Sequence, residues 1–467
     1  MSETTRTEHD LLGDYEIPRD AYWGVHTARA RDNFPISGVP IGHYRSLVTA
    51  LANVKEAAAR ANADLGAVPA DIAECIARAA RDIAAGGYDE HFIVDLIQGG
   101  AGTSTNMNAN EVIANRALDL LGEPHGTYSR VHPLNHVNQS QSTNDVYPTA
   151  LKVAMIKEIE ALIDAMAYLR GAFDAKAREF ADVVKMGRTQ MQDAVPMTLG
   201  QEFGTFGRML GEDEQRLRDL IPLLCEINLG GTAIGTGLNA PVGYSVKACG
   251  YLAVITGIPF TPAEDLVEAT QDVGVFVMFS GVLKRIAVKL SKTANDLRLL
   301  SSGPRAGLGE INLPPMQAGS SIMPGKVNPV IPEVVNQIAY TVIGNDVTVT
   351  MAAEGGQLQL NAFEPIMARG LLQSLTYLRQ GCYILANRCV SGITANVDQL
   401  RANVERSIGT VTALAPYLGY ENATAVAQRA QATGGSVRDV VLELKLMGEV
   451  ELDAILGDVR KLVHPQG

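Results

Sequence analysis

Residues 152–184 decide the fold, with the sequence KVAMIKEIEALIDAMAYLRGAFDAKAREFADVV. Their apolar side chains recur at intervals of three, four and seven positions, at Ile156, Ile159, Ile163, Met166, Leu169, Phe173 and Phe180. This spacing places them along one face of a helix. Residues 271–300 and 364–390 follow the same period. Thirty helical residues span about 45 Å, longer than the core of a compact single domain requires. The sequence therefore predicts an elongated helical bundle.

The rest of the chain also favours a mostly α fold. Strand signals are few and do not form the alternating series of strands and helices that a dinucleotide-binding fold requires. Shorter helices before and after the long ones predict three domains: an N-terminal helical domain at 1–145, a central long-helix domain at 146–395, and a small C-terminal helical domain at 396–467. The stretch VGVFVMFSGVL at 273–283 is apolar nearly all round. We therefore expect partner subunits to cover part of it, in a homo-oligomer.

Composition and charge exclude several classes of protein. Of the 467 residues, 46% are hydrophobic and 19% are charged, which is typical of a globular protein and not of a disordered chain or a coiled-coil rod. The net charge of −12 repels phosphate backbones and anionic head groups, so we expect neither a nucleic-acid nor a membrane partner. The longest uncharged run, 227–246, is broken by Gly, Asn and Pro, and we do not expect it to span a bilayer.

The cysteines and the N-terminus predict a cytoplasmic location. Five cysteines, an odd number without C-x-x-C spacing, favour free buried thiols in a reducing compartment. The first 14 residues, MSETTRTEHDLLGD, lack the apolar segment of a secretory signal.

Tracts rich in Gly, Ser, Thr and Asn, whose only charged residue is Lys326, lie between the expected helices, at 98–110, 137–144, 228–244 and 316–328. Small polar residues form turns, and that explanation is preferred for any single tract. Several such tracts in one chain favour a second explanation, an anion-binding site. Hydroxyls, amides and backbone N–H groups at helix starts can surround a small anion. A compact carboxylate ligand fits these donors.

The last tract contains GSSIMPGKVN and resembles a phosphate-binding loop only superficially. Five residues separate Gly319 from Gly325 where a Walker A loop has four, and Val327 stands where Ser or Thr must bind magnesium. What remains is a glycine-flanked loop that carries a hydroxyl near a fixed cation. This arrangement suits removal of a proton from a carbon next to a carboxylate.

Other catalytic chemistries have weaker support. His132 and His136 are four residues apart, but Pro133 argues against a helix there and no Asp/His set completes a metal-binding pattern, so we expect a hydrogen-bonding role and no metal. The chain has no G-x-S-x-G motif for acyl transfer and no Ala-Ser-Gly tripeptide that could form an electrophilic prosthetic group. Any elimination is expected to use ordinary side chains and no cofactor.

Taken together, these residues resemble the aspartase/fumarase superfamily, whose signature matches GSSIMPGKVNP at 319–329. The likeness covers nearly the whole chain, in order: DLLGDYEIPRDAYWGVHTARARDNF, GTSTNMNANEVIANRA, NHVNQSQSTNDVYPTA, GRTQMQDAVPMTLGQEF and NLGGTAIGTGLN. The resemblance implies a three-domain helical protein that forms a homotetramer around a central bundle. It also implies that three subunits contribute to each active site.

Four positions resemble the aspartate ammonia-lyase branch more than class II fumarases. Residues 142–144 read STN rather than SSN, and 135–138 read NHVN rather than DDVN. Gln190 replaces the histidine that pairs in fumarases with the equivalent of Glu333, and PVIPEVVNQ follows the signature. The implied reaction converts L-aspartate reversibly to fumarate and ammonia. The alternatives are hydration of fumarate to malate and a non-catalytic structural role, for which this fold has been recruited as a lens crystallin.

The resemblance also implies a role for each site residue. Ser320 corresponds to the base that removes the proton from the carbon bearing the β-carboxylate, and its anion requires stabilisation by loop N–H groups and positive charge. The alternative for Ser320 is a cap on the helix that starts near Pro329. The expected donors to the resulting aci-carboxylate are Thr103, Ser142, Thr143 and Ser321. The α-carboxylate is expected to bind Lys326, Asn328 and Thr189. The leaving amino group is expected to face Asn144 and Gln190.

Overall fold

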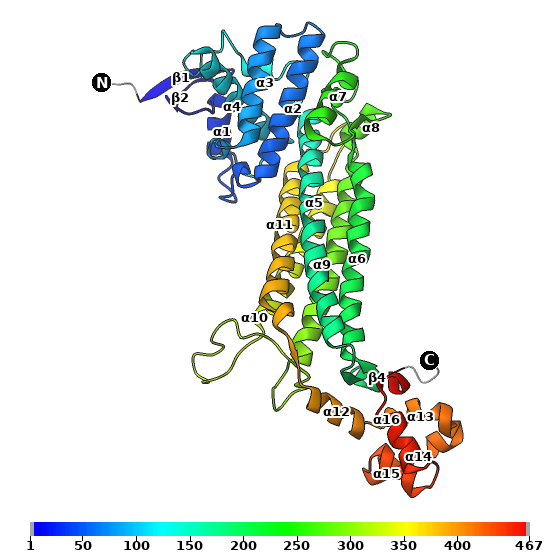
Figure 1. Cartoon of the computed structure of the whole chain (residues 1–467). Helices are drawn as coiled ribbons and strands as arrows, with labels where there is room; N and C mark the ends of the chain where they lie inside the picture. Colours follow the sequence, from blue (N-terminus) through cyan, green and yellow to red (C-terminus); the bar gives the residue numbers. More distant parts are fainter. Residues whose placement is uncertain (1–3, 464–467) are drawn as a thin grey trace. The chain divides into compact units, whose positions relative to one another are not determined.

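The structure is a computed structural model that describes residues 4–463, and it is mostly helical (Figure 1). Its longest helices are α5 (Thr143–Glu179), α6 (Leu199–Leu224), α9 (Gly274–Leu300), α10 (Val330–Glu354) and α11 (Glu364–Arg388). The three periodic stretches correspond to α5, α9 and α11, which confirms the mostly α prediction. Helix α5 begins earlier than residue 152 and ends before 184, because Val184 already belongs to a strand.

Contacts divide the chain into two compact units, each made of three separate segments. Unit 1 comprises the described residues up to Ile163, together with Gln215–Arg285 and Tyr340–Tyr377. Unit 2 comprises Asp164–Glu214, Ile286–Ala339 and the described residues from Leu378 onward. Every boundary between units falls inside one of the five long helices. The domain boundaries near residues 145 and 395 rest on the sequence and stay a prediction.

Unit 1 contains shorter helices that pack through small and branched apolar side chains. Its helices are α1 (Val25–Asn33), α2 (Arg45–Asp64), α3 (Ala70–Ala85), α4 (Thr103–Leu121), α7 (Tyr244–Thr256) and α8 (Leu266–Gln271), with 3-10 turns at Ile41–His43 and Asp89–His91. Strands β1 (Thr5–Asp10) and β2 (Gly13–Pro18) form an antiparallel hairpin, and β5 (Glu226–Ile227) pairs in parallel with β6 (Thr261–Pro262). Helix α3 shows why these helices form, since Ile72, Ile76 and Ile83 share one buried face.

Unit 2 contains an antiparallel hairpin and a cluster of short C-terminal helices. The hairpin joins β3 (Val184–Thr189) to β4 (Gln192–Thr198), and β7 (Ile311–Asn312) pairs antiparallel with β8 (Thr394–Ala395). A 3-10 turn (Val390–Gly392) precedes α12 (Val397–Arg406), α13 (Thr410–Leu418), α14 (Tyr420–Thr433), α15 (Val437–Glu443), α16 (Glu449–Leu456) and α17 (Val459–Val463). Leu414, Val426 and Leu452 belong to the apolar core of these helices.

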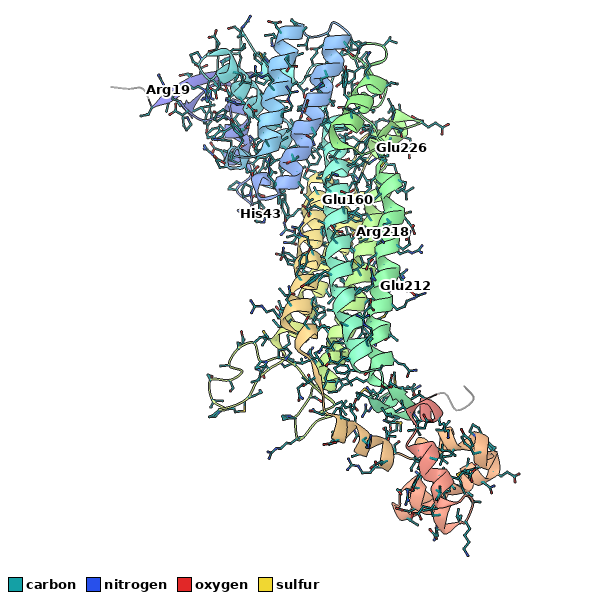
Figure 2. All side chains as sticks on the ribbon, viewed as in Figure 1. Arg19, His43, Glu160, Glu212, Arg218 and Glu226 are labelled. Atoms are coloured by element: carbon teal, nitrogen blue, oxygen red, sulfur yellow. The ribbon has the colours of Figure 1, made fainter. Side chains whose placement is uncertain are left out.

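Charged side chains lie on the exposed face of α6, and ion pairs join α9 to its neighbours. Glu212 and Arg218 extend from the exposed face of α6 (Figure 2), whereas Leu217 and Leu220 on the same helix are buried. In unit 2, Lys289 of α9 forms an ion pair with Asp213 of α6 at 3.0 Å. In unit 1, Lys284 of α9 pairs with Asp346 of α10 at 2.6 Å. Each unit therefore holds its helix segments together through both apolar and ionic contacts.

Four of the five cysteines are buried free thiols, as the sequence predicts, whereas Cys75 is free but only half-buried. The four buried cysteines are Cys225, Cys249, Cys382 and Cys389. Over residues 4–463, no helix combines the length and apolar character needed to cross a membrane.

Candidate active site

The first group of predicted site residues lies in unit 1, where α4 and α5 begin. Thr103 is the first residue of α4, and its exposed hydroxyl donates to the Gly100 carbonyl at 2.8 Å. Thr143 begins α5, and its Oγ1 accepts a hydrogen bond from Asn106 Nδ2 at 3.0 Å. Ser142 Oγ accepts from the Asn144 N–H at 3.2 Å. Because these two hydroxyl oxygens act as acceptors, their own hydrogens remain available for donation.

Asp145 joins two of the uncharged tracts that the sequence singles out. One carboxylate oxygen accepts from the Ser142 N–H at 3.0 Å, and the other accepts from the N–H groups of Gly230 and Thr232, both at 3.0 Å. Asn144 Nδ2 also donates to the Ala233 carbonyl at 2.7 Å. The tracts at 137–144 and 228–244 are therefore held together. Burial raises the pKa of Asp145 to about 6, although the three backbone N–H groups favour the charged form.

Lys55 of α2 contacts the tract at 137–144. The sequence prediction does not include this residue. Its buried amino group donates to Asn138 Oδ1 and Gln141 Oε1, both at 2.9 Å. Burial lowers the pKa of Lys55 to about 7. Sequence reasoning had one signal available, because Lys55 follows Leu47 and Leu51 at helical spacing and thus falls on the apolar face of α2.

The second group lies in unit 2, starting with the β3–β4 hairpin. Thr189 ends β3, and Gln190 and Met191 form the two-residue turn with φ values of +52° and +64°. Thr189 and Gln190 are both exposed. The fully buried carboxylate of Glu310 pairs with Arg188 at 2.6 Å and with Lys185 at 3.0 Å, which anchors β3. Glu310 is another positioning residue that the sequence prediction lacks.

The serine loop, residues 319–328, also belongs to unit 2 and is closed at its base. The Gly319 N–H donates to the Lys326 carbonyl at 2.9 Å, and Asn328 Nδ2 donates to the Gly319 carbonyl at 2.6 Å. Ser320 Oγ accepts from the N–H groups of Ile322 at 3.2 Å and Met323 at 2.9 Å. Because both donors lie within the loop, while α10 begins only at Val330, the alternative role of Ser320 as a cap on that helix is wrong.

Two residues of the serine loop leave their polar groups toward solvent. Ser321 and Lys326 are exposed, and within residues 4–463 neither side chain forms a hydrogen bond or an ion pair. The loop thus carries one available cation and one available hydroxyl next to a serine oxygen that already faces two N–H donors. Such a set can bind an anion and stabilise a second negative charge.

The two histidines take a structural role, as predicted. His132 Nδ1 accepts from the N–H groups of Leu134 and Asn135, and His136 Nδ1 accepts from the His132 N–H at 3.0 Å. The expectation that Pro133 prevents a helix is wrong, since Pro133–Val137 form one turn of π-helix. Proline is tolerated at the first position of a helix because its missing N–H needs no partner there. In the described part of the chain, no three His, Cys, Asp or Glu side chains cluster to hold a metal ion.

The predicted site residues thus fall into two groups, one in each unit. Thr103 and residues 142–144 form the group in unit 1, beside the tract at 228–244. Thr189, Gln190 and four residues of the serine loop belong to unit 2. Unit 1 thus supplies uncharged hydroxyl and amide groups, and the serine loop of unit 2 supplies a hydroxyl oxygen held by two backbone amides.

Comparison with known proteins identifies the family. A family model described as Lyase matches residues 13–344, and one described as Fumarase C C-terminus matches residues 411–464. The chain belongs to this lyase family of the aspartase/fumarase superfamily, as its sequence motifs indicated.

Individual relatives match over nearly their full length. An aspartate ammonia-lyase from Pseudomonas aeruginosa is 58% identical, covering 97% of this chain and 96% of that protein. A crystal structure from Brucella melitensis, described as fumarate lyase:delta crystallin, has a TM-score of 0.95 at 55% identity and covers 98% of this chain and 99% of that one. A class II fumarase from Schistosoma mansoni has a TM-score of 0.93 at 34% identity, covering 99% and 100%.

Proposed function

We propose that this protein is an aspartate ammonia-lyase, which eliminates ammonia reversibly from L-aspartate to give fumarate without a cofactor. The observation that carries the proposal is the position of Ser320 Oγ, which accepts two backbone N–H groups inside a closed loop. The 58% identity to the P. aeruginosa aspartate ammonia-lyase supports the choice of substrate, because it extends over nearly both chains.

Ser320 is the proposed base. A serine hydroxyl is a very poor base in water, so its anion must be stabilised before it can take a proton from carbon. The N–H groups of Ile322 and Met323 point at this oxygen and strengthen their hydrogen bonds when it becomes charged. Lys326, on the same loop and without a partner among the described side chains, supplies positive charge.

Removal of the proton places a second charge on the β-carboxylate, which the site must bind more tightly than the ground state. We assign this task to the hydroxyls of Thr103, Ser142, Thr143 and Ser321. The acceptor roles of Ser142 and Thr143 toward neighbouring N–H groups support the assignment, since both keep a hydrogen to donate. Thr103 must rotate away from the Gly100 carbonyl to take part.

The α-carboxylate and the amino group complete the substrate. Lys326 and Thr189 are the proposed partners of the α-carboxylate, with the second N–H of the Asn328 amide, because the first already donates to Gly319. Asn144 Nδ2 donates to the Ala233 carbonyl, so its Oδ1 remains to accept from the substrate ammonium. Gln190 is assigned the same role and cannot act as a proton shuttle.

We further propose a homotetramer in which three subunits build each active site, located in the cytoplasm. Helix α10 supports the assembly, because Tyr340, Val347 and Met351 are about 60% exposed. A groove of about 430 Å³ beside them is lined by Val347, Met351, Phe363 and Ile366. Light scattering after size exclusion tests the assembly and should give the mass of four 49.8 kDa chains. The four buried free thiols support a reducing compartment.

The activity assay follows the ultraviolet absorbance of fumarate after L-aspartate or L-malate is added to purified protein. Signal from L-aspartate supports the proposal, signal from L-malate alone would establish the fumarase alternative, and signal from neither would favour a structural role. Ser320→Ala should lose roughly 10²- to 10⁴-fold in turnover, the usual contribution of a general base, and keep the oligomeric mass. Ser301→Ala is the matched control, because that hydroxyl only donates within its own helix end. Near-normal turnover of Ser320→Ala would remove Ser320 from this role.

A further inference from the structure

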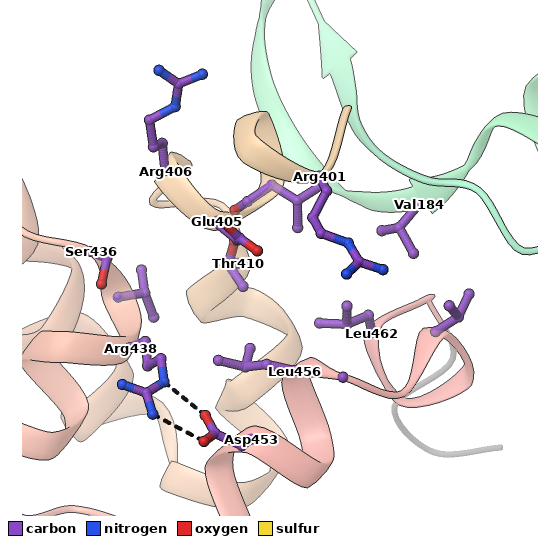
Figure 3. A pocket seen from close by; sticks show the side chains of 14 residues that line it. Val184, Arg401, Glu405, Arg406, Thr410, Ser436, Arg438, Asp453, Leu456 and Leu462 are labelled. Atoms are coloured by element: carbon purple, nitrogen blue, oxygen red, sulfur yellow. Dashed lines mark hydrogen bonds and ion pairs between the residues drawn. The ribbon is translucent and has the colours of Figure 1, made fainter. Parts of the chain in front are cut away.

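A second cavity lies among the C-terminal helices of unit 2, outside the residues assigned to catalysis (Figure 3). It has a volume of about 560 Å³, within the range of small-molecule sites. Its apolar wall consists of Val184, Val404, Val437, Leu456, Val459 and Leu462. The cavity is therefore large enough, and apolar enough, to receive an aliphatic or aromatic side chain.

Two unpaired charges of opposite sign line the cavity. Arg401 and Glu405 are one turn apart on α12, and both line the cavity (Figure 3). Among residues 4–463, neither forms a hydrogen bond or an ion pair, and they do not pair with each other. A guanidinium and a carboxylate so placed are both free to meet a ligand.

The other arginines around the cavity are engaged or turned away. Arg438 binds both carboxylate oxygens of Asp453, at 2.7 and 2.9 Å, and Glu449 at 2.7 Å, so it forms part of the wall. Arg406 extends away from the cavity in Figure 3, and its Nε donates to the Ala402 carbonyl at 3.1 Å. Among the described residues that line the cavity, Arg401 is thus the cation that remains for a ligand.

We propose that this cavity binds a zwitterionic α-amino acid with an apolar side chain. The guanidinium of Arg401 receives the carboxylate, for which its fork of N–H donors is suited, and Glu405 receives the ammonium. A simple anion would be repelled by Glu405, and a simple cation by Arg401. The side chain of the amino acid is buried against Leu456 and Leu462. L-Aspartate should bind more weakly, because its second carboxylate would lose water without gaining a cation.

Isothermal titration calorimetry on the full-length protein tests this proposal with L-leucine and L-phenylalanine as probes. L-Leucinamide lacks the carboxylate and N-acetyl-L-leucine lacks the ammonium, so each should bind at least about tenfold more weakly than L-leucine. Arg401→Gln and Glu405→Gln should each weaken L-leucine binding by about tenfold or more. Arg406→Gln, on the same helix, is the matched control and should leave it unchanged.

Because Arg401 and Glu405 are exposed, their substitution should leave the fold intact, which unchanged melting temperatures would verify. The proposal is overturned if neither amino acid gives a binding heat. It is also overturned if both variants bind L-leucine as the parent does. None of these outcomes bears on turnover of L-aspartate, so the proposed function is tested separately.

Discussion

Gly319→Ala is a sharp test of the serine loop, because the closed base of the loop leaves no room for a side chain. A Cβ atom at residue 319 would clash with the Lys326 carbonyl oxygen and lie 2.8 Å from the Asn328 nitrogen. Both neighbours are backbone atoms, which cannot rotate away as a flexible side chain can. The substitution must therefore separate the two ends of the loop.

Separating the ends breaks two hydrogen bonds, from the Gly319 N–H to Lys326 and from Asn328 to the Gly319 carbonyl. At about 0.5–1.5 kcal/mol each, the closed loop loses about 1–3 kcal/mol relative to open forms. If only the closed loop presents Ser320 correctly, kcat/KM for L-aspartate should fall by a factor that reaches roughly 5- to 150-fold when the open forms come to dominate.

Two measurements test this prediction together. Initial rates of fumarate formation give kcat/KM, and hydrogen exchange followed by mass spectrometry reports whether the amides of residues 319–328 lose protection. Gly250→Ala is the control, because a Cβ there meets open space on the exposed side of α7. Parental kcat/KM in Gly319→Ala, combined with faster exchange of the loop, would refute the claim that the closed base is the active arrangement.

Two further predictions concern the buried charges. In Lys55→Met, stability should improve relative to the wild type as the pH falls from about 9 to about 7. Over this range the unfolded lysine is protonated, whereas the folded one, with its pKa lowered to about 7, resists protonation. The free energy of unfolding of the wild type thus falls by up to about 2.7 kcal/mol between about pH 9 and about pH 7. Melting curves of both proteins at both pH values test this. A stability difference between wild type and variant that is the same at both pH values would reject it. Glu310→Gln should lower stability by about 3–5 kcal/mol and reduce kcat/KM, because Lys185 and Arg188 lose a buried partner. Glu202→Gln, at a more exposed partner of Lys185, should have the smaller effect on melting temperature, and equal effects would contradict the argument.

Sequence periodicity predicts the long helices because their buried apolar side chains recur every three or four residues. The same reasoning misses the start of α5, where Thr143, Asn144 and Asp145 carry no apolar period, although Asp145 is fully buried. An acidic residue in the first turn of a helix is ordinarily explained by the helix dipole. Besides the nearby Ser142 N–H, its partners are Gly230 and Thr232, more than eighty residues away in sequence, and no local pattern indicates these distant contacts.

In the serine loop, too, the sequence identifies residues but not all of their contacts. The motif identifies Ser320, Lys326 and Asn328, and resemblance to the family supplies their expected roles. The bond from Asn328 to Gly319 gives Asn328 an additional role in closing the loop, which its residue type alone does not predict. Glu310 is similar, since only the folded chain reveals that its carboxylate meets two cations of β3.

The interleaving of the two units has a consequence for synthesis of the chain. Unit 1 is complete only when Tyr340–Tyr377 have been made, which is after 377 of the 467 residues. At about 5–20 residues per second, helices α2 and α3, complete by residue 85, precede the last segment of unit 1 by roughly 15 to 60 s. During that time the part of unit 1 that is already made lacks the segments of α10 and α11 that complete it.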